Sequence, residues 1–167
     1  MPVDTLEILY RLLAALACGV VIGLNRDFHG KPAGFRTFGL VGLGSAVVVL
    51  SMHQVSGSGA DAVSRVVQGV LTGIGFLGAG VILHRVQQGK VAGLTTAASV
   101  WVTAGLGMAA GAGQYKLIGV ALALCMLVLL FGRACERLFE RLFGRKRKNH
   151  KHDSQAPPPA PPSAGDL

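Results

Sequence analysis

The sequence predicts an all-α membrane protein: a bundle of about five glycine-rich transmembrane helices with a basic amphipathic cytoplasmic extension. Hydrophobic residues make up 51% of the 167 residues and charged residues only 14%, well below the roughly 25% of soluble domains. The run 68–83 has no ionisable side chain and five glycines. In a lipid bilayer the backbone of such a run has no water to bond to, so it forms a helix. Glycine then lets neighbouring helix backbones approach closely.

Five apolar runs give the expected spans, at about 6–24, 37–54, 66–83, 93–113 and 115–132, within a transmembrane domain over 1–132. A span needs about 20 predominantly apolar residues. The first, third and fourth runs meet this length directly. The second and fifth runs meet it only with flanking residues such as Thr37 and Lys116.

The positions of the cations predict the orientation. Thirteen of the sixteen Lys and Arg residues fall in the first and third loops or after the fifth span. Cytoplasmic segments collect Lys and Arg. We therefore expect the amino terminus outside and the carboxyl terminus in the cytoplasm.

The residues after the spans divide into two segments. Residues 133–153 form a basic amphipathic cytoplasmic segment, either an extension of the fifth span or a helix on the anionic leaflet. Residues 154–167 contain five prolines and are expected to be disordered. The basic run 145–148 could be a nucleic-acid patch, but its place after a span favours a membrane anchor, so no nucleic-acid partner is expected.

Glycines in the third span are expected to be helix contacts. Gly69, Gly73 and Gly80 fall within about 40° of one another on a helix, and Gly75 lies on a second stripe with Ala79. Two contact faces predict that this helix is central. The glycines 73, 75 and 78 also fit a dinucleotide-binding pattern, but no strand precedes them, so no cofactor is expected.

The fourth span has one face of small and hydroxyl-bearing residues. Thr96, Ser99, Thr103 and Gly107 recur every three or four positions. Their hydroxyls are expected to form hydrogen bonds between helices, and a polar path is the alternative. Trp101, near mid-span, is expected to fill a groove opposite the glycines.

The first span and the loop after it carry the remaining candidates. Glu7 and Arg11 are an i, i+4 pair near the outer end, either structural or guarding an outward-facing vestibule. Gly19 and Gly23 have the spacing for close helix packing. The charges of the first loop either set the topology or form an ion network or partner surface; its candidate residues are Asn25, Arg26, Asp27, Gly34, Arg36 and Thr37.

Sites for metals or catalysis are not predicted. None of the eight acidic residues lies in the middle of a span, whereas ion carriers usually have carboxylates there. The three cysteines lack metal-ligand spacing, and the five histidines fall in loops or in the tail. We therefore expect no cofactor, no metal site and no enzymatic activity.

Two long stretches, 69–81 and 93–108, resemble the MgtC/SapB family of membrane proteins, and the shorter stretches 23–26 and 34–37 fit too. The resemblance covers about residues 8–130. Its motif positions include Gly75, Phe76, Gly78, Gly93, Thr95 and Gly105. The chain departs from the family at Asn25, where Glu is usual, and in its basic, proline-rich tail, where longer members carry a soluble domain.

The resemblance implies a bacterial inner-membrane protein linked to magnesium limitation and, in pathogens, to survival inside host cells. Some members are labelled magnesium-transport accessory proteins, and the family is also thought to act on other membrane proteins. We expect a regulatory or accessory factor whose partners are the lipid bilayer, other membrane proteins and copies of itself. The alternatives are a small transporter or channel for Mg²⁺, using the hydroxyl face and Gln68, and a function based on the basic tail.

Overall fold

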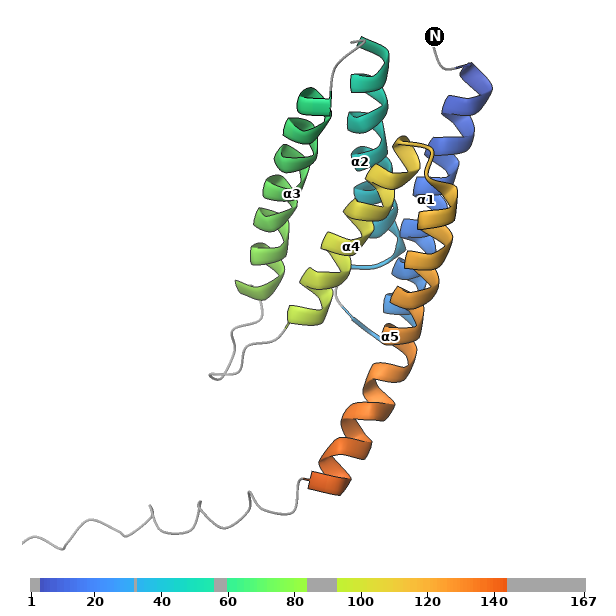
Figure 1. Cartoon of the computed structure of the whole chain (residues 1–167). Helices are drawn as coiled ribbons and strands as arrows, with labels where there is room; N and C mark the ends of the chain where they lie inside the picture. Colours follow the sequence, from blue (N-terminus) through green and yellow to red (C-terminus); the bar gives the residue numbers. More distant parts are fainter. Residues whose placement is uncertain (1–3, 32, 56–59, 84–92, 144–167) are drawn as a thin grey trace, which may run out of the picture. The chain divides into compact units, whose positions relative to one another are not determined.

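The structure, a computed structural model, describes residues 4–31, 33–55, 60–83 and 93–143. Five helices form in chain order: α1 Thr5–Phe28, α2 Phe35–Val55, α3 Ala60–Leu83, α4 Leu94–Gly111 and α5 Tyr115–Phe143 (Figure 1). Each is long and apolar enough to cross a membrane. The predicted all-α membrane fold is thus confirmed.

The chain divides into two units, residues 1–129 and residues 130–167. The first unit holds α1 to α4 and the beginning of α5. In the second unit the helix continues to Phe143. The side chains of the predicted basic segment 133–153 and all of the tail after residue 143 lie outside the described residues, so the predictions for them stay predictions.

The helices begin and end close to the expected positions, with one difference that matters for the site. α1 continues to Phe28, where the backbone N–H groups of His29 and Gly30 bond to the carbonyls of Arg26 and Asp27. The expectation that positions 25–27 belong to the first loop is therefore wrong. Helix continues there because Arg26 is buried against the bundle, only 4% exposed.

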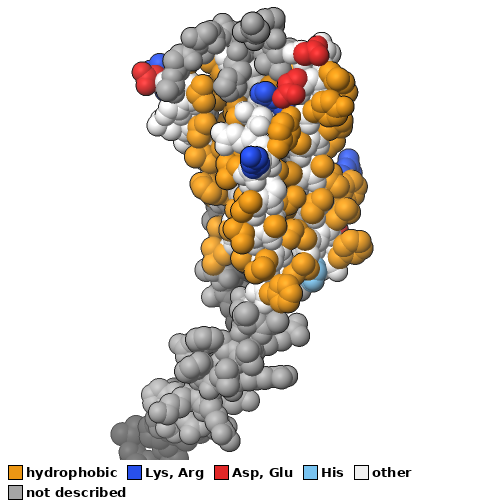
Figure 2. All heavy atoms as spheres, turned by 45° about the vertical axis from the view of Figure 1, so that its right-hand side comes forward, with side chains coloured by type: hydrophobic (Ala, Val, Ile, Leu, Met, Phe, Trp, Pro, Cys, Tyr) orange, Lys and Arg blue, Asp and Glu red, His pale blue; other side chains and the backbone are white. Residues whose placement is uncertain are grey.

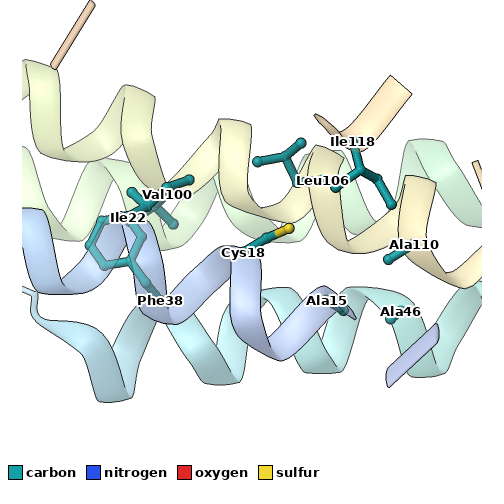
Figure 3. Close-up of a cluster of buried hydrophobic side chains, with 9 residues drawn as sticks. All are labelled: Ala15, Cys18, Ile22, Phe38, Ala46, Val100, Leu106, Ala110 and Ile118. Atoms are coloured by element: carbon teal, nitrogen blue, oxygen red, sulfur yellow. The ribbon is translucent and has the colours of Figure 1, made fainter. Parts of the chain in front are cut away.

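The core of the first unit is built around α4, which contacts α1, α2 and α3. Figure 3 shows the buried apolar side chains that α1, α2, α4 and α5 contribute: Ala15, Cys18, Ile22, Phe38, Ala46, Val100, Leu106, Ala110 and Ile118. α3 lies at the edge, beside α4 (Figure 1). The prediction that α3 is central is wrong, because the small residues of α4 fill the centre instead.

Close helix contacts depend on glycine at particular positions. A Cβ on Gly19 would collide with the backbone of Phe38, and one on Gly23 with the backbone of Phe35. A Cβ on Gly107 would collide with the backbone of Gly42. Backbones this close give the dense packing that holds helices together in lipid. The predicted packing role of these three glycines is confirmed.

The outside of the first unit is apolar. Figure 2 shows hydrophobic side chains covering most of the helical face in view. Large exposed examples are Leu40 (70%), Val120 (62%) and Leu124 (59%). An apolar surface of this extent suits contact with acyl chains rather than water.

Candidate functional site: an open glycine face and three polar contacts

α3 has one packed side and one open side. On the packed side Gly78 is buried, and a Cβ there would lie 3.5 Å from the Cβ of Ala97 in α4, an ordinary contact distance. Ile74 on the same side packs against the core. These contacts attach α3 to the bundle along a single side of the helix.

The opposite side, here called the open face, consists of Gly69, Thr72, Gly73, Phe76 and Gly80. All five residues are exposed, and the side chain of Phe76 is 82% exposed. A Cβ added at any of the three glycines would meet nothing within 4 Å. The open face therefore carries three glycines beside one aromatic ring, and Gly73 at its edge borders the space between α3 and α2.

Gly75 and Gly105 likewise have no neighbour within 4 Å of an added Cβ. Neither glycine makes a close contact with the described part of the chain. The expectation that glycines of α3 other than Gly78 pack inside the bundle is therefore wrong. Contact between those glycines and other chains stays a prediction.

Gly93 shapes the connection from α3 to α4. It is the N-cap residue of α4, and its φ of 98° is in the left-handed region that favours glycine. A Cβ at this position would lie 2.9 Å from the carbonyl oxygen of Val81. Glycine is therefore needed at position 93 both for its left-handed backbone conformation and for the lack of space for a side chain. Thr95, in the first turn of α4, is exposed.

The hydroxyl face of α4 is buried at Thr96, Ser99 and Thr103, which are 2%, 4% and 0% exposed. Ser99 Oγ donates to the Thr95 carbonyl at 2.7 Å, and Thr103 Oγ1 donates to the Ser99 carbonyl at 2.8 Å. The expected bonds between helices are therefore wrong for these two residues. Their short side chains reach the carbonyl four residues earlier, which satisfies the hydroxyl within its own helix.

Thr96 does form a bond between helices. Its Oγ1 accepts a hydrogen bond from Nη2 of Arg26, and both side chains are buried. This contact joins the last turn of α1 to the first turn of α4. A buried guanidinium depends on such partners, because moving a charge out of water is costly.

Asp27 and Gly34 organise the turn from α1 to α2. Asp27 Oδ2 accepts a hydrogen bond from the backbone N–H of Phe35 at 2.9 Å. The missing side chain of Gly34 leaves room for that carboxylate. Asp27 thus supplies a negative group at the start of α2, where the helix dipole favours it.

The other polar residues of this region are directed elsewhere. Arg36 and Thr37 are exposed in the first turn of α2, while Asn25 is half-buried and its carbonyl oxygen lies 2.6 Å from His29 Nδ1. The loop candidates therefore divide into an inward group at Arg26, a cap at Asp27 and an outward group at Arg36 and Thr37.

The predicted pair at the outer end is confirmed: Arg11 Nε lies 2.8 Å from Glu7 Oε1. Arg11 Nη1 also donates to the Gly111 carbonyl at 3.0 Å, and the Tyr115 hydroxyl donates to Glu7 at 3.3 Å. A cation at the carboxyl end of α4 matches the helix dipole. The pair therefore ties α1 to the turn between α4 and α5.

Trp101 is 51% exposed, so the expectation that it fills a groove is wrong. The packed face of α4 runs through Ser99 and Thr103, and Trp101 lies on the other side of the helix. Its ring is half exposed on the outer surface of the first unit.

Sequence reasoning missed two glycines that pack closely. A Cβ on Gly42 would lie 2.7 Å from the Ala15 carbonyl oxygen, and one on Gly111 would lie 2.7 Å from the Ala46 carbonyl oxygen. Gly111 follows Gly107 at the small-xxx-small spacing of packed membrane helices. That spacing was the available signal.

Among the described residues, no group of three or more His, Cys, Asp or Glu side chains is placed to hold a metal ion. The described cysteines Cys18 and Cys125 are free thiols, one buried and one half-buried.

The chain is similar to known proteins over most of its length. A family model described as MgtC family matches residues 12–138. "Protein SrpB" of Synechococcus elongatus is 41% identical over 91% of this chain and 92% of its own length. "Putative magnesium transporter YhiD" of Escherichia coli K12 is 46% identical over 75% of this chain, and "Protein MgtC" of Salmonella typhimurium LT2 is 42% identical over 71%.

The matches to the last two relatives cover 60% of YhiD and 50% of MgtC, so this chain spans only part of their length. No solved structure gives a significant match.

Proposed function

Since the chain belongs to the MgtC family, we propose that it is a regulatory or accessory membrane protein that binds other membrane proteins, or further copies of itself, through the open face of α3. One observation carries this proposal. An added Cβ at Gly69, Gly73 or Gly80 meets nothing within 4 Å, although glycine is the residue that permits the closest helix contacts.

The close contacts between α1, α2 and α4 indicate how a glycine face can bind another helix. Gly19, Gly23 and Gly107 each receive a neighbouring backbone at a distance that no Cβ would allow. In lipid the drive to associate comes from this dense packing rather than from hydrophobic burial. At Gly69, Gly73 and Gly80 the open face offers a similarly small surface for such packing.

The proposed setting is the bacterial inner membrane, with the amino terminus outside and the carboxyl terminus in the cytoplasm. The excess of Lys and Arg in residues 26–36, 85–90 and 133–151 supports this orientation. The name of one relative, "Putative magnesium transporter YhiD", supports a link to magnesium, which we propose to be adaptation to magnesium limitation. The protein would act by binding, not by catalysis.

The test is co-purification from native membranes after crosslinking, in low and high Mg²⁺. Gly80→Leu should insert normally but lose the bound protein, because the added side chain occupies the partner's position. Gly119→Leu is the matched control, since Gly119 on α5 also has nothing within 4 Å. If Gly80→Leu keeps the same complex and the same growth at low Mg²⁺, the proposal is wrong.

A second candidate function is transport of Mg²⁺ or another ion, which the name of YhiD favours. The purified protein in liposomes decides between the two. Ion flux that is lost in Thr103→Val would support transport. Absence of flux in wild-type liposomes would support the accessory function.

A further inference from the structure

A groove lies between α2 and α3, with a volume of about 690 Å³. Its walls include Leu40, Gly44 and Val48 from α2 and Gly73 and Leu77 from α3. An added Cβ at Gly44 or Gly73 would meet nothing within 4 Å, so the two glycines leave the space between the helices empty. The volume is within the usual range of ligand sites.

The polar groups of this groove are concentrated at one end. Arg36 and Thr37, both exposed, line the end at the first turn of α2. Ser45, further along, is occupied within its own helix, where its Oγ donates to the Val41 carbonyl at 2.8 Å. The groove therefore has a cationic end and an apolar remainder.

The length of the groove matches one leaflet of a bilayer. From Arg36 to Val48 the α2 helix rises about 18 Å. One leaflet contributes about half of a hydrocarbon core of roughly 30 Å. A partner transmembrane helix needs the full thickness, whereas one acyl chain with its headgroup at the interface needs about this length.

The charge of the groove selects the headgroup. Arg36 presents five donors to phosphate oxygens. None of the described residues that line the groove is acidic, and the carboxylate of Asp27 accepts a hydrogen bond from the Phe35 N–H. A headgroup with a net negative charge therefore fits better than one that also carries an ammonium group.

We infer that this groove binds one anionic phospholipid, with its phosphate on Arg36 and Thr37 and one acyl chain between Gly44 and Gly73. On the proposed orientation, this lipid belongs to the cytoplasmic leaflet, where basic sites between helices recognise anionic headgroups. The leaflet assignment rests on the orientation given with the proposed function, and the groove shares Gly73 with the open face. The variants that test the groove lie on α2, so a failure of this inference can be told apart from a failure of the proposed function.

The test is native mass spectrometry of the full chain in detergent, with phosphatidylglycerol or phosphatidylethanolamine carrying identical acyl chains. The wild type should bind one phosphatidylglycerol more tightly than phosphatidylethanolamine. Arg36→Gln should weaken phosphatidylglycerol binding about five- to tenfold. It should weaken phosphatidylethanolamine binding less, because the ammonium group of that lipid already offsets the phosphate charge. Gly44→Leu should weaken both lipids, because its side chain fills the groove.

Two controls make the result decisive. Lys116→Gln removes an exposed cation at the beginning of α5 and should bind as the wild type does. The thermal transition of Gly44→Leu should stay at the wild-type temperature, since its Cβ meets no neighbour. One contrary result is that Arg36→Gln keeps the wild-type preference for phosphatidylglycerol, and another is that Lys116→Gln loses as much phosphatidylglycerol binding as Arg36→Gln. Either result would mean that lipid binds the protein surface without a specific site, and it would overturn the inference. The inference would also be overturned if Gly44→Leu lost a co-purifying protein while its lipid binding stayed at the wild-type level.

Discussion

α3 and α4 are both rich in small residues, yet they pack in opposite ways. α4 places its small face, including Thr103 and Gly107, against α1 and α2. α3 directs most of its glycines away from the bundle and uses Gly78 for contact. The difference shows that small residues determine how closely another helix can pack against a helix. Whether a helix of the same chain packs there depends on the surface that this other helix offers.

The largest expected effect compares two glycines of α4 that are two residues apart. Gly107→Ala should destabilise the bundle by about 1–3 kcal/mol, because its Cβ collides with the backbone of Gly42. Gly105→Ala should leave stability unchanged or slightly higher, since its Cβ meets no neighbour and Ala favours helix. Thermal unfolding in detergent measures both, and equal transitions for the two variants would break the comparison.

An effect of similar size is expected at the buried contact between α1 and α4. Thr96→Val keeps the side-chain shape but removes the acceptor of Arg26 Nη2, and should cost about 1–3 kcal/mol. The same unfolding assay measures this loss. Thr95→Val is the matched control on the exposed neighbour, and an equally large loss there would show that the Arg26 contact is not the cause.

The smallest effect is expected at the outer end of α1. Arg11→Gln removes the ion pair with Glu7 and weakens the contact with the Gly111 carbonyl. Both side chains of the pair are partly exposed, so water compensates for much of the loss. The unfolding temperature should fall by less than in Thr96→Val. A larger fall would indicate that this link, rather than the α4 face, holds the bundle together.

The five spans could be predicted from sequence because lipid requires long apolar helices, and the charges between them mark the ends. The ion pair of Glu7 and Arg11 follows from local spacing alone. The central position of α4 could not be predicted, because both α3 and α4 have small faces and periodicity does not say which face another helix covers. Trp101 was misplaced for the same reason.

The contacts that join distant parts of the chain were also beyond sequence reasoning. Charge usually marks the end of a span, which predicts a loop at Arg26, but the helix continues there and the guanidinium is buried beside Thr96. Ser99 and Thr103 were expected to bond across helices, although a bond to the carbonyl four residues earlier was available locally.

Site-specific photo-crosslinking in native membranes tests the open face of α3 most directly. A benzophenone side chain in place of Phe76, whose ring is 82% exposed, should crosslink to a discrete protein, either a partner or a second copy. The same group in place of Leu124, which is 59% exposed on α5, should label lipid alone. Lipid as the sole product at both positions would contradict the account.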